Sequence, residues 1–277
     1  MIEWERLPDL RSPIMVTAFE GWNDAGEAAT DAIDHLRQVW GSNPLAELDP
    51  DDYYDFQVTR PHIRVEEEGR SVTWPTTRVF VASAPTRDIV IVHGIEPNMR
   101  WRAFCEDILG IARDLGIERI VNLGALLADV PHTRPVPLTA FATEPTLISA
   151  LGLDQSTYDG PTGIVGVLQH AAEMAEIPAL SLWAAVPHYV SQAPCPKAAL
   201  ALLQRMEDIM DLSIPLGDLP DEAAAWQRGV DEMALEDDEI GEYVGQLERA
   251  RDSEDLPEAS GDAIAAEFER YLRRRGS

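Results

Sequence analysis

Continuous apolar runs alternate along most of the chain with segments whose apolar positions recur every three or four residues. Residues 14–19 and 89–92 are almost wholly apolar, as is typical of strands buried on both faces of a parallel sheet. Residues 29–40 and 101–115 carry apolar side chains at helical spacing, so a helix is predicted after each of these strands. Further strands are predicted at 63–67, 71–74, 79–82, 119–123, 136–142 and 179–186, and further helices at 162–176 and 198–210. This alternation predicts an α/β fold with a mixed sheet.

Two other segments of this region are predicted from their composition. Residues 43–61 are rich in proline and aspartate, and we expect them to run over the surface. Residues 136–142 lie in a proline-spaced stretch. Because proline has no N–H to donate to a ladder, this strand is predicted at a sheet edge. Glu67, Glu68, Gly69 and Arg70 would suit the turn of a hairpin.

After Pro215 the pattern predicts helices only. One apolar stripe comprises Trp226, Val230 and Met233, and a second comprises Ile240, Val244 and Leu247. A last short helix is predicted at 263–272. We therefore divide the chain into an α/β core domain, residues 1–214, and an acidic C-terminal helical region, residues 215–277.

The charge of the chain excludes some classes of partner. The formal net charge is −27, and residues 207–262 contain 19 acidic and three basic residues, so they carry −16 of it. Phosphates and anionic lipid surfaces repel such a chain, so neither nucleic acid nor membrane is an expected partner. The acidic residues of this segment are most simply the solvated faces of its helices.

Cysteine content and hydropathy indicate a cytoplasmic protein. The two cysteines, Cys105 and Cys195, lie far apart in the sequence, and a secreted disulfide framework would need more. The N-terminus lacks the features of a signal peptide, and no run of about 18 apolar residues is present to span a membrane. No metal-ligand spacing such as Cys-x-x-Cys occurs, so neither a metal nor a cofactor is predicted.

The turn after the first strand is the first candidate for chemistry. It contains Gly21 and Gly26 but no Gly-x-Gly-x-x-Gly pattern and no Walker lysine, and the carboxylates of Glu20, Asp24 and Glu27 would repel phosphate. Asp24 and Glu27 have the spacing of a capping box, in which Asp24 accepts from the Glu27 amide. Asp24 is therefore either a helix cap or one half of a carboxylate pair with Glu20.

Polar residues follow three more strands, at 93–98, 129–135 and 187–189. Loops at the carboxyl ends of parallel strands converge on one crevice, so a single pocket could be lined by Asp24, Glu96, His132, Arg134 and His188. Histidines beside carboxylates can perform acid–base catalysis or hold a metal. The same residues can also serve only as hydrogen-bonding elements of turns, and no Gly-x-Ser-x-Gly elbow of a serine hydrolase is present.

These turns carry a family resemblance. The residues concerned are Gly21-Trp22-Asn23-Asp24-Ala25-Gly26, residues 93–97 with Trp101, Gly124-Ala125-Leu126, residues 130–135, and Pro187-His188-Tyr189. Together they resemble the proteasome assembly chaperone family of the second-chaperone type, in the bacterial branch typical of actinobacteria. The resemblance implies a three-layer α/β/α fold similar to the nucleoside phosphorylase and hydrolase-like proteins, with the acidic helical tail typical of that branch. It also implies a homo-oligomer, such as a trimer, and no established enzymatic activity for the bacterial members.

The chain departs from proteasome-binding relatives that end in a hydrophobic-tyrosine-any tripeptide, because it ends Arg274-Arg275-Gly276-Ser277. Two functions of different class therefore stay open. The first is an oligomeric scaffold or assembly factor with a protein partner, in which Trp22, Asn23, Asp24, Arg134 and Tyr189 are the candidate binding residues. The second is a small-molecule enzyme, a hydrolase or phosphorylase-like protein, in which Asp24, Glu96, His132 and His188 are the candidate catalytic residues.

Overall fold

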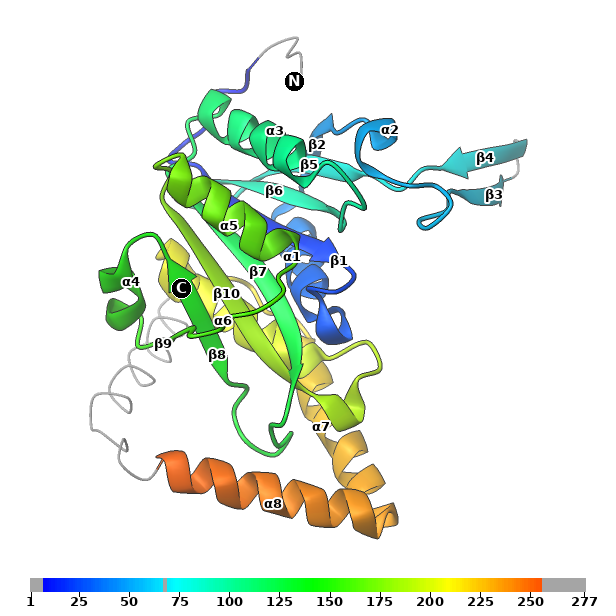
Figure 1. The fold of residues 1–277 in the computed structure, drawn as a ribbon, viewed down its shortest axis with the longest axis vertical. Coiled ribbons are helices and arrows are strands. Elements are labelled where there is room, and N and C mark those ends of the chain that lie inside the picture. Colours follow the sequence, from blue (N-terminus) through cyan, green and yellow to red (C-terminus); the bar gives the residue numbers. More distant parts are fainter. Residues whose placement is uncertain (1–6, 67–68, 256–277) are drawn as a thin grey trace.

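A computed structural model describes residues 7–66 and 69–255 of the chain, which form a mixed eight-stranded sheet between two layers of helices (Figure 1). The strand order is β2-β5-β6-β1-β7-β10-β8-β9. The four central strands are parallel: β6 (Asp88–Ile95), β1 (Ile14–Glu20), β7 (Arg119–Ala128) and β10 (Ala179–Pro187). This architecture confirms the predicted three-layer α/β fold with a mixed sheet.

Antiparallel strands flank this parallel centre on both sides. On one side β5 (Thr77–Ser83) pairs with β6, and β2 (Asn43–Glu47) pairs with β5. On the other side β8 (Leu138–Ala142) pairs with β10, and the two-residue strand β9 (Asp154–Gln155) pairs with β8. The prediction of an edge strand at 136–142 is therefore wrong, because β9 occupies the outer side of β8.

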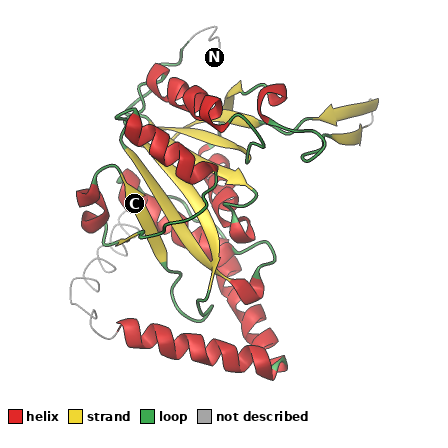
Figure 2. Cartoon of the chain, viewed as in Figure 1, coloured by secondary structure: helices red, strands yellow, loops and turns green. Residues whose placement is uncertain are grey.

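The alternation of side chains along the central strands explains why both faces of the sheet are covered. Along β1, Ile14, Val16 and Ala18 belong to one buried cluster, whereas Met15 and Phe19 belong to the other. The first cluster is closed by α1 (Ala28–Trp40) and α6 (Pro196–Met210), and the second by α3 (Trp101–Asp114) and α5 (Ile164–Met174). Figure 2 shows the two helical layers on opposite sides of the strands.

The C-terminal region adds two long helices. Helix α7 (Leu219–Glu236) packs along α6, and its Leu219 and Trp226 contact the first cluster. Helix α8 (Asp238–Asp255) follows after a single residue and turns across the end of the molecule (Figure 1). Both helices were predicted, and the helix predicted at 263–272 lies outside the described residues. No helix in the described ranges is long and apolar enough to cross a membrane.

A β-hairpin projects from the body of the molecule (Figure 1). Its strands are β3 (His62–Glu66) and β4 (Gly69–Thr73), which form a separate two-stranded sheet. The strands predicted at 63–67 and 71–74 are thereby confirmed as elements, each with its start shifted by one or two residues.

The structure corrects the prediction that residues 43–61 run only over the surface. They contain β2 and a short helix, α2 (Pro50–Tyr53), and Tyr53 and Tyr54 are buried. The Tyr53 hydroxyl donates to Asp107 at 2.6 Å, and the Tyr54 hydroxyl donates to the carbonyl of Ile95 at 2.8 Å. A further short helix, α4 (Pro145–Ala150), precedes β9 and was not predicted.

Candidate functional site

The turn after β1 is built around the buried carboxylate of Asp24. Its Oδ1 accepts from the backbone N–H groups of Ala29 at 2.7 Å and Thr30 at 3.3 Å, and the Thr30 hydroxyl donates to Oδ2. Burial raises the pKa of Asp24 above its ordinary value, although these three donors oppose the shift. Asp24 therefore caps the first turn of α1, but not as the predicted capping box. Glu27 has a left-handed backbone (φ 53°), and the capped amides lie beyond it.

Asn23 and Glu96 join three segments behind this turn. Glu96 Oε1 accepts from Asn23 Nδ2 at 2.7 Å and from the backbone N–H of Ile164 at 2.8 Å, at the start of α5. Asn23 is fully buried, and a Cβ on Gly163 would lie 2.1 Å from its Oδ1. The space around Asn23 thus requires glycine at position 163, and the Glu96 carboxylate serves to hold the loops together.

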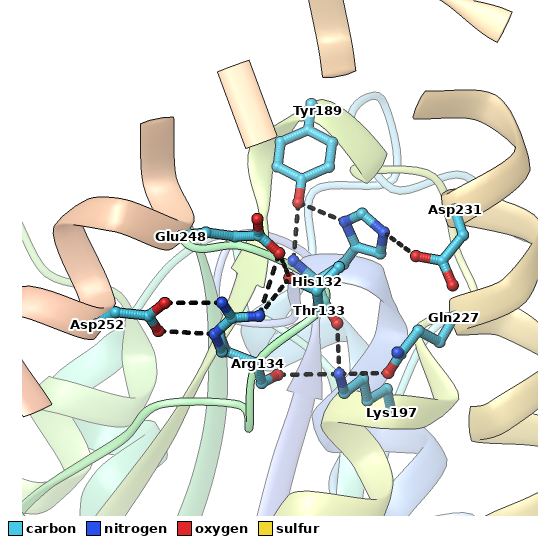
Figure 3. Close-up of polar contacts among 9 residues, drawn as sticks. All are labelled: His132, Thr133, Arg134, Tyr189, Lys197, Gln227, Asp231, Glu248 and Asp252. Atoms are coloured by element: carbon cyan, nitrogen blue, oxygen red, sulfur yellow. Dashed lines mark hydrogen bonds and ion pairs between the residues drawn. The ribbon is translucent and has the colours of Figure 1, made fainter. Parts of the chain in front are cut away.

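His132 lies at the centre of a second polar cluster (Figure 3). Its backbone N–H donates to the Tyr189 hydroxyl at 2.8 Å, its Nδ1 lies 2.8 Å from the same oxygen, and its Nε2 lies 3.0 Å from Asp231 on α7. Burial lowers the pKa of His132, outweighing the attraction of Asp231, and burial raises the pKa of Tyr189 to about 12. Both ring nitrogens of His132 are therefore engaged within the protein.

Arg134 and Lys197 extend this cluster to α7 and α8 (Figure 3). The Arg134 guanidinium donates to Asp252 at 2.7 and 2.8 Å and to Glu248 at 3.1 Å, both on α8. The Lys197 ammonium donates to the carbonyls of His132 and Arg134 and to Gln227 on α7. The loop after β7 thus binds both C-terminal helices.

His188 contributes to the same attachment. Its Nδ1 lies 3.0 Å from Asp129, which also accepts from the Tyr243 hydroxyl of α8 at 3.1 Å. The rings of His188, Tyr189 and Tyr243 meet edge to face. We name the residues 129–134, 188, 189 and 197, with their partners on α7 and α8, the helix clamp.

The loops after the parallel strands therefore form two groups of residues rather than one. Asp24 and Trp22 line a large cavity, whereas Glu96, His132, Arg134 and His188 are absent from its lining. The expectation that five of these side chains would share one pocket is corrected. His132, Arg134 and His188 belong to the helix clamp, because α7 and α8 cover the loops that carry them.

The cavity measures about 1310 Å³ and is acidic. Six carboxylates line it and no lysine or arginine does, and aromatic side chains form part of its wall. Burial and the neighbouring carboxylates of Glu27, Asp24 and Asp34 raise the pKa of Asp31 to about 6. The lining carboxylates are Glu20, Asp24, Glu27, Asp31, Asp34 and Glu173.

Sequence reasoning did not find the aromatic wall of this cavity. The Trp183 indole lies close to β7, where a Cβ on Gly124 would be 2.6 Å from the ring, and Tyr158 comes from the loop before α5. Gly124 inside a buried strand was the available signal for such a close approach. No group of three or more histidine, cysteine, aspartate or glutamate side chains suited to a metal ion occurs among the residues described.

Comparisons with known proteins agree with this architecture. Residues 18–234 match the model of the PAC2 family. A PAC2 family protein from Streptomyces avermitilis is 55% identical, with 84% of this chain and 99% of that chain covered and a TM-score of 0.79. A proteasome-assembly chaperone homologue from Mycobacterium tuberculosis is 50% identical over 83% of this chain and 99% of that chain, with a TM-score of 0.78.

An archaeal proteasome activator from Pyrococcus furiosus shares the fold at 18% identity, with 84% of this chain and 97% of that chain covered and a TM-score of 0.66. None of the curated proteins matches the chain. The matched family model spans more than half of the sequence, and the two bacterial structures cover most of it at high identity. The chain belongs to the PAC2 family and is a homologue of proteasome assembly chaperones.

Proposed function

We propose that this protein is an oligomeric assembly factor that binds proteasome subunits and promotes their assembly, without catalysing a reaction. Its family and the names of its relatives support the choice of partner. The net charge of −27 supports a protein partner over nucleic acid or lipid.

The observation that carries this proposal is that the candidate acid–base side chains form contacts within the fold. Both ring nitrogens of His132 have partners inside the protein, and His188 is paired with Asp129. Glu96 binds a buried asparagine and a helix N-terminus. A catalytic group must reach the proton that it transfers, and these groups instead connect the parts of the fold. These contacts support an assembly factor over the alternative of a small-molecule enzyme with Asp24, Glu96, His132 and His188 as catalytic residues.

Reconstitution of proteasome assembly tests the proposal. Purified α and β subunits from the same cell would be mixed with and without the intact protein, and complete particles would be followed over time by native gel electrophoresis. We expect faster formation of complete particles, and a complex with free subunits detectable by native mass spectrometry.

An unrelated protein of similar negative charge serves as the control, because it reports any effect of acidity alone. The proposal fails if the intact protein neither binds the subunits nor changes their assembly rate, or if the acidic control has the same effect.

A further inference from the structure

The cavity lined by six carboxylates, which we name the acidic cavity, is bounded by side chains from both faces of the sheet. Trp183 packs against the cluster that α3 and α5 close, whereas Asp31 and Asp34 lie on α1, which closes the other cluster. The lining also includes Trp22, from the turn after β1, and Leu126, near the end of β7. An occupant of the whole cavity therefore needs an apolar part for the aromatic wall and a cationic part for the carboxylates.

The acidic cavity suits a segment of protein chain better than a small molecule. Its volume of about 1310 Å³ exceeds the range of about 300–1,000 Å³ that small-molecule sites occupy. Large side chains on its rim are exposed to solvent, with exposed fractions of 63% for Trp22, 66% for Tyr158 and 41% for Leu126. Exposed apolar side chains gathered around a concave surface mark an interaction site.

Three exposed carboxylates of the acidic cavity have no lysine or arginine beside them. Asp34 pairs with Arg37, but Glu20 and Glu173 each lie 3.9 Å from a histidine ring nitrogen only. Glu27 forms no ion pair among the residues that the structure describes. Charges of one sign that line a concave surface focus the electric field and raise the local concentration of the opposite charge. The acidic cavity therefore favours a cationic segment.

The chain itself contains a segment of this charge, after the described part of α8. Residues 270–275 have the sequence Arg-Tyr-Leu-Arg-Arg-Arg, with four basic residues and no acidic residue. No other window of six residues in the chain contains more than two lysines or arginines. Residues 263–275 include Glu267 and Glu269 as well, so their formal net charge is +2 from four arginines and two glutamates.

The same segment has an apolar part. Ile264, Phe268 and Tyr271 recur at positions i, i+4 and i+7 of the helix predicted at 263–272. Side chains with this spacing share one face of a helix. The segment thus combines an apolar, aromatic face with a cluster of arginines, which are the two properties that the acidic cavity requires.

The length of chain allows the segment to reach the cavity. Asp252 of α8 binds Arg134, and Leu127 of the cavity lining lies seven residues before Arg134. At about 3.6 Å per residue, at most about 25 Å of chain separates Leu127 from Arg134. Residues 256–262 can span about 25 Å when extended, and a helix of ten residues adds about 15 Å. A short tether of this kind gives an effective concentration in the millimolar range.

We propose that residues 263–275 dock in the acidic cavity of their own chain. The apolar face of the predicted helix packs on the aromatic wall at Trp183. The arginines pair with the exposed carboxylates and stack on the exposed indole of Trp22, because a guanidinium group binds both carboxylates and aromatic faces. An occupied cavity is closed to segments of other proteins until residues 263–275 leave it. This docking does not rest on the proposed function or on the identity of an assembly partner.

Disulfide trapping in the full chain tests the contact. Ser156→Cys, a nearly isosteric change in the cavity lining, is combined with Leu272→Cys, and the native thiols of Cys105 and Cys195 are buried. Mass spectrometry follows disulfide formation after addition of copper phenanthroline. The control pair is Leu235→Cys with Leu272→Cys, because Leu235 is an exposed residue of α7 outside the cavity. We expect the cavity pair to react at least about tenfold faster than the control pair.

A second cavity position guards against a variant that does not fold or is badly oriented. Ser191 also lines the acidic cavity and is exposed, so Ser191→Cys with Leu272→Cys forms this second pair. Circular dichroism checks that each variant is folded. Disulfide formation no faster than in the control pair at both cavity positions would overturn the inference.

The charge and the origin of the segment are tested in the same assay. Arg273→Glu, Arg274→Glu and Arg275→Glu together should slow the reaction of the cavity pair to the control rate, whereas lysine at the same three positions should retain most of the fast rate. Equal rates for the two triple variants would contradict the role of charge. Non-reducing gel electrophoresis should show a crosslinked monomer. A crosslinked dimer would place the segment of a neighbouring chain in the cavity and would overturn docking within one chain.

Discussion

At the scale of single residues, Glu96 shows how an ionisable group at a strand end can act entirely within the fold. Its carboxylate replaces water for two donors, the side-chain amide of the buried Asn23 and the first N–H of α5 at Ile164. Because a buried donor without an acceptor costs about 1–3 kcal/mol, the geometry of three loops depends on this one side chain.

We expect Glu96→Ala to lower the free energy of unfolding by about 2–4 kcal/mol, since both donors lose their acceptor. Glu96→Gln should lower it less, because the glutamine amide retains an acceptor oxygen. Urea denaturation of the two variants measures the difference. Equal losses for alanine and glutamine would show that the carboxylate has no acceptor role at this position.

The raised pKa of Asp31 predicts that the stability of the fold depends on pH. Burial and the carboxylates of Glu27, Asp24 and Asp34 raise the pKa of Asp31 to about 6 in the folded protein, from 3.8. Between these two values the folded state keeps a proton that the unfolded state has lost, so this group destabilises the fold progressively as pH rises through that window. We therefore expect Asp31→Asn to raise the melting temperature by a few degrees at pH 7.5, and by less at pH 5.

Asp34, one turn along the same helix, provides a control of opposite sign. Burial opposes its ionisation, but the contacts with His93 and Arg37 prevail and lower the pKa of Asp34. Its charge therefore stabilises the folded protein above its unfolded pKa. Asp34→Asn should lower the melting temperature at pH 7.5, and a rise there would contradict the electrostatic assignment of both residues.

At the scale of secondary-structure elements, α8 differs from the other helices in the kind of contacts that attach it to the rest of the protein. The helices of the two layers bury apolar stripes, whereas among the described residues of α8 only Val244 is a buried apolar side chain. Much of its attachment is polar and comes from Arg134, Thr133 and Asp129 in the helix clamp. Polar contacts near solvent contribute little to global stability, so α8 should open locally.

Removal of the Arg134 guanidinium tests this attachment. Arg134→Ala should accelerate amide hydrogen exchange in α8 by about tenfold, while the global free energy of unfolding changes by less than about 1 kcal/mol. Arg134→Lys should give an intermediate rate, because lysine cannot form the bidentate contact with Asp252. Unchanged exchange in α8 in both variants would show that other contacts hold the helix.

The elements themselves were largely predictable from the sequence, and the contacts that make the site were not. Strands such as 89–92 and helices such as 101–115 can be predicted from local periodicity, because that pattern depends only on neighbouring residues. The hydroxyl groups of the buried Tyr53 and Tyr54 donate to Asp107 and to the carbonyl of Ile95, which lie more than 40 residues away in the chain. Local composition does not encode such contacts, and residues 43–61 were for this reason predicted as surface.

Contacts between residues far apart in the chain also explain why the candidate site residues do not line one pocket. The ends of the parallel strands do lie at one edge of the sheet, as expected. The partners of His132 and Arg134, however, are Asp231 and Asp252, which lie 99 and 118 residues further along the chain. The sequence predicts the acidic helices but does not indicate the surface on which they pack. Their packing against the loops that carry His132 and Arg134 could therefore not be predicted.

At the scale of the whole molecule, the helical region is unequally attached to the α/β core. Ile214 is buried in the core cluster, and Leu216, Leu219 and Trp226 pack against it, so α7 completes the apolar face of α6. Helix α8 joins mainly through the helix clamp. The stability of the core should therefore depend on α7 far more than on α8.

Two truncations of the chain test this difference. A chain ending at residue 236 keeps α7 and should melt within a few degrees of the full protein, because few apolar contacts are lost. A chain ending at residue 214 leaves the apolar face of α6 in water. At about 25 cal/mol per Å² of exposed apolar surface, the lost burial of Leu216, Leu219 and Trp226 lowers the free energy of unfolding by several kcal/mol. An exposed apolar face of this kind also promotes aggregation. Differential scanning fluorimetry and size-exclusion chromatography compare the three proteins. A stable, monodisperse chain of residues 1–214 would show instead that the core folds independently of α7.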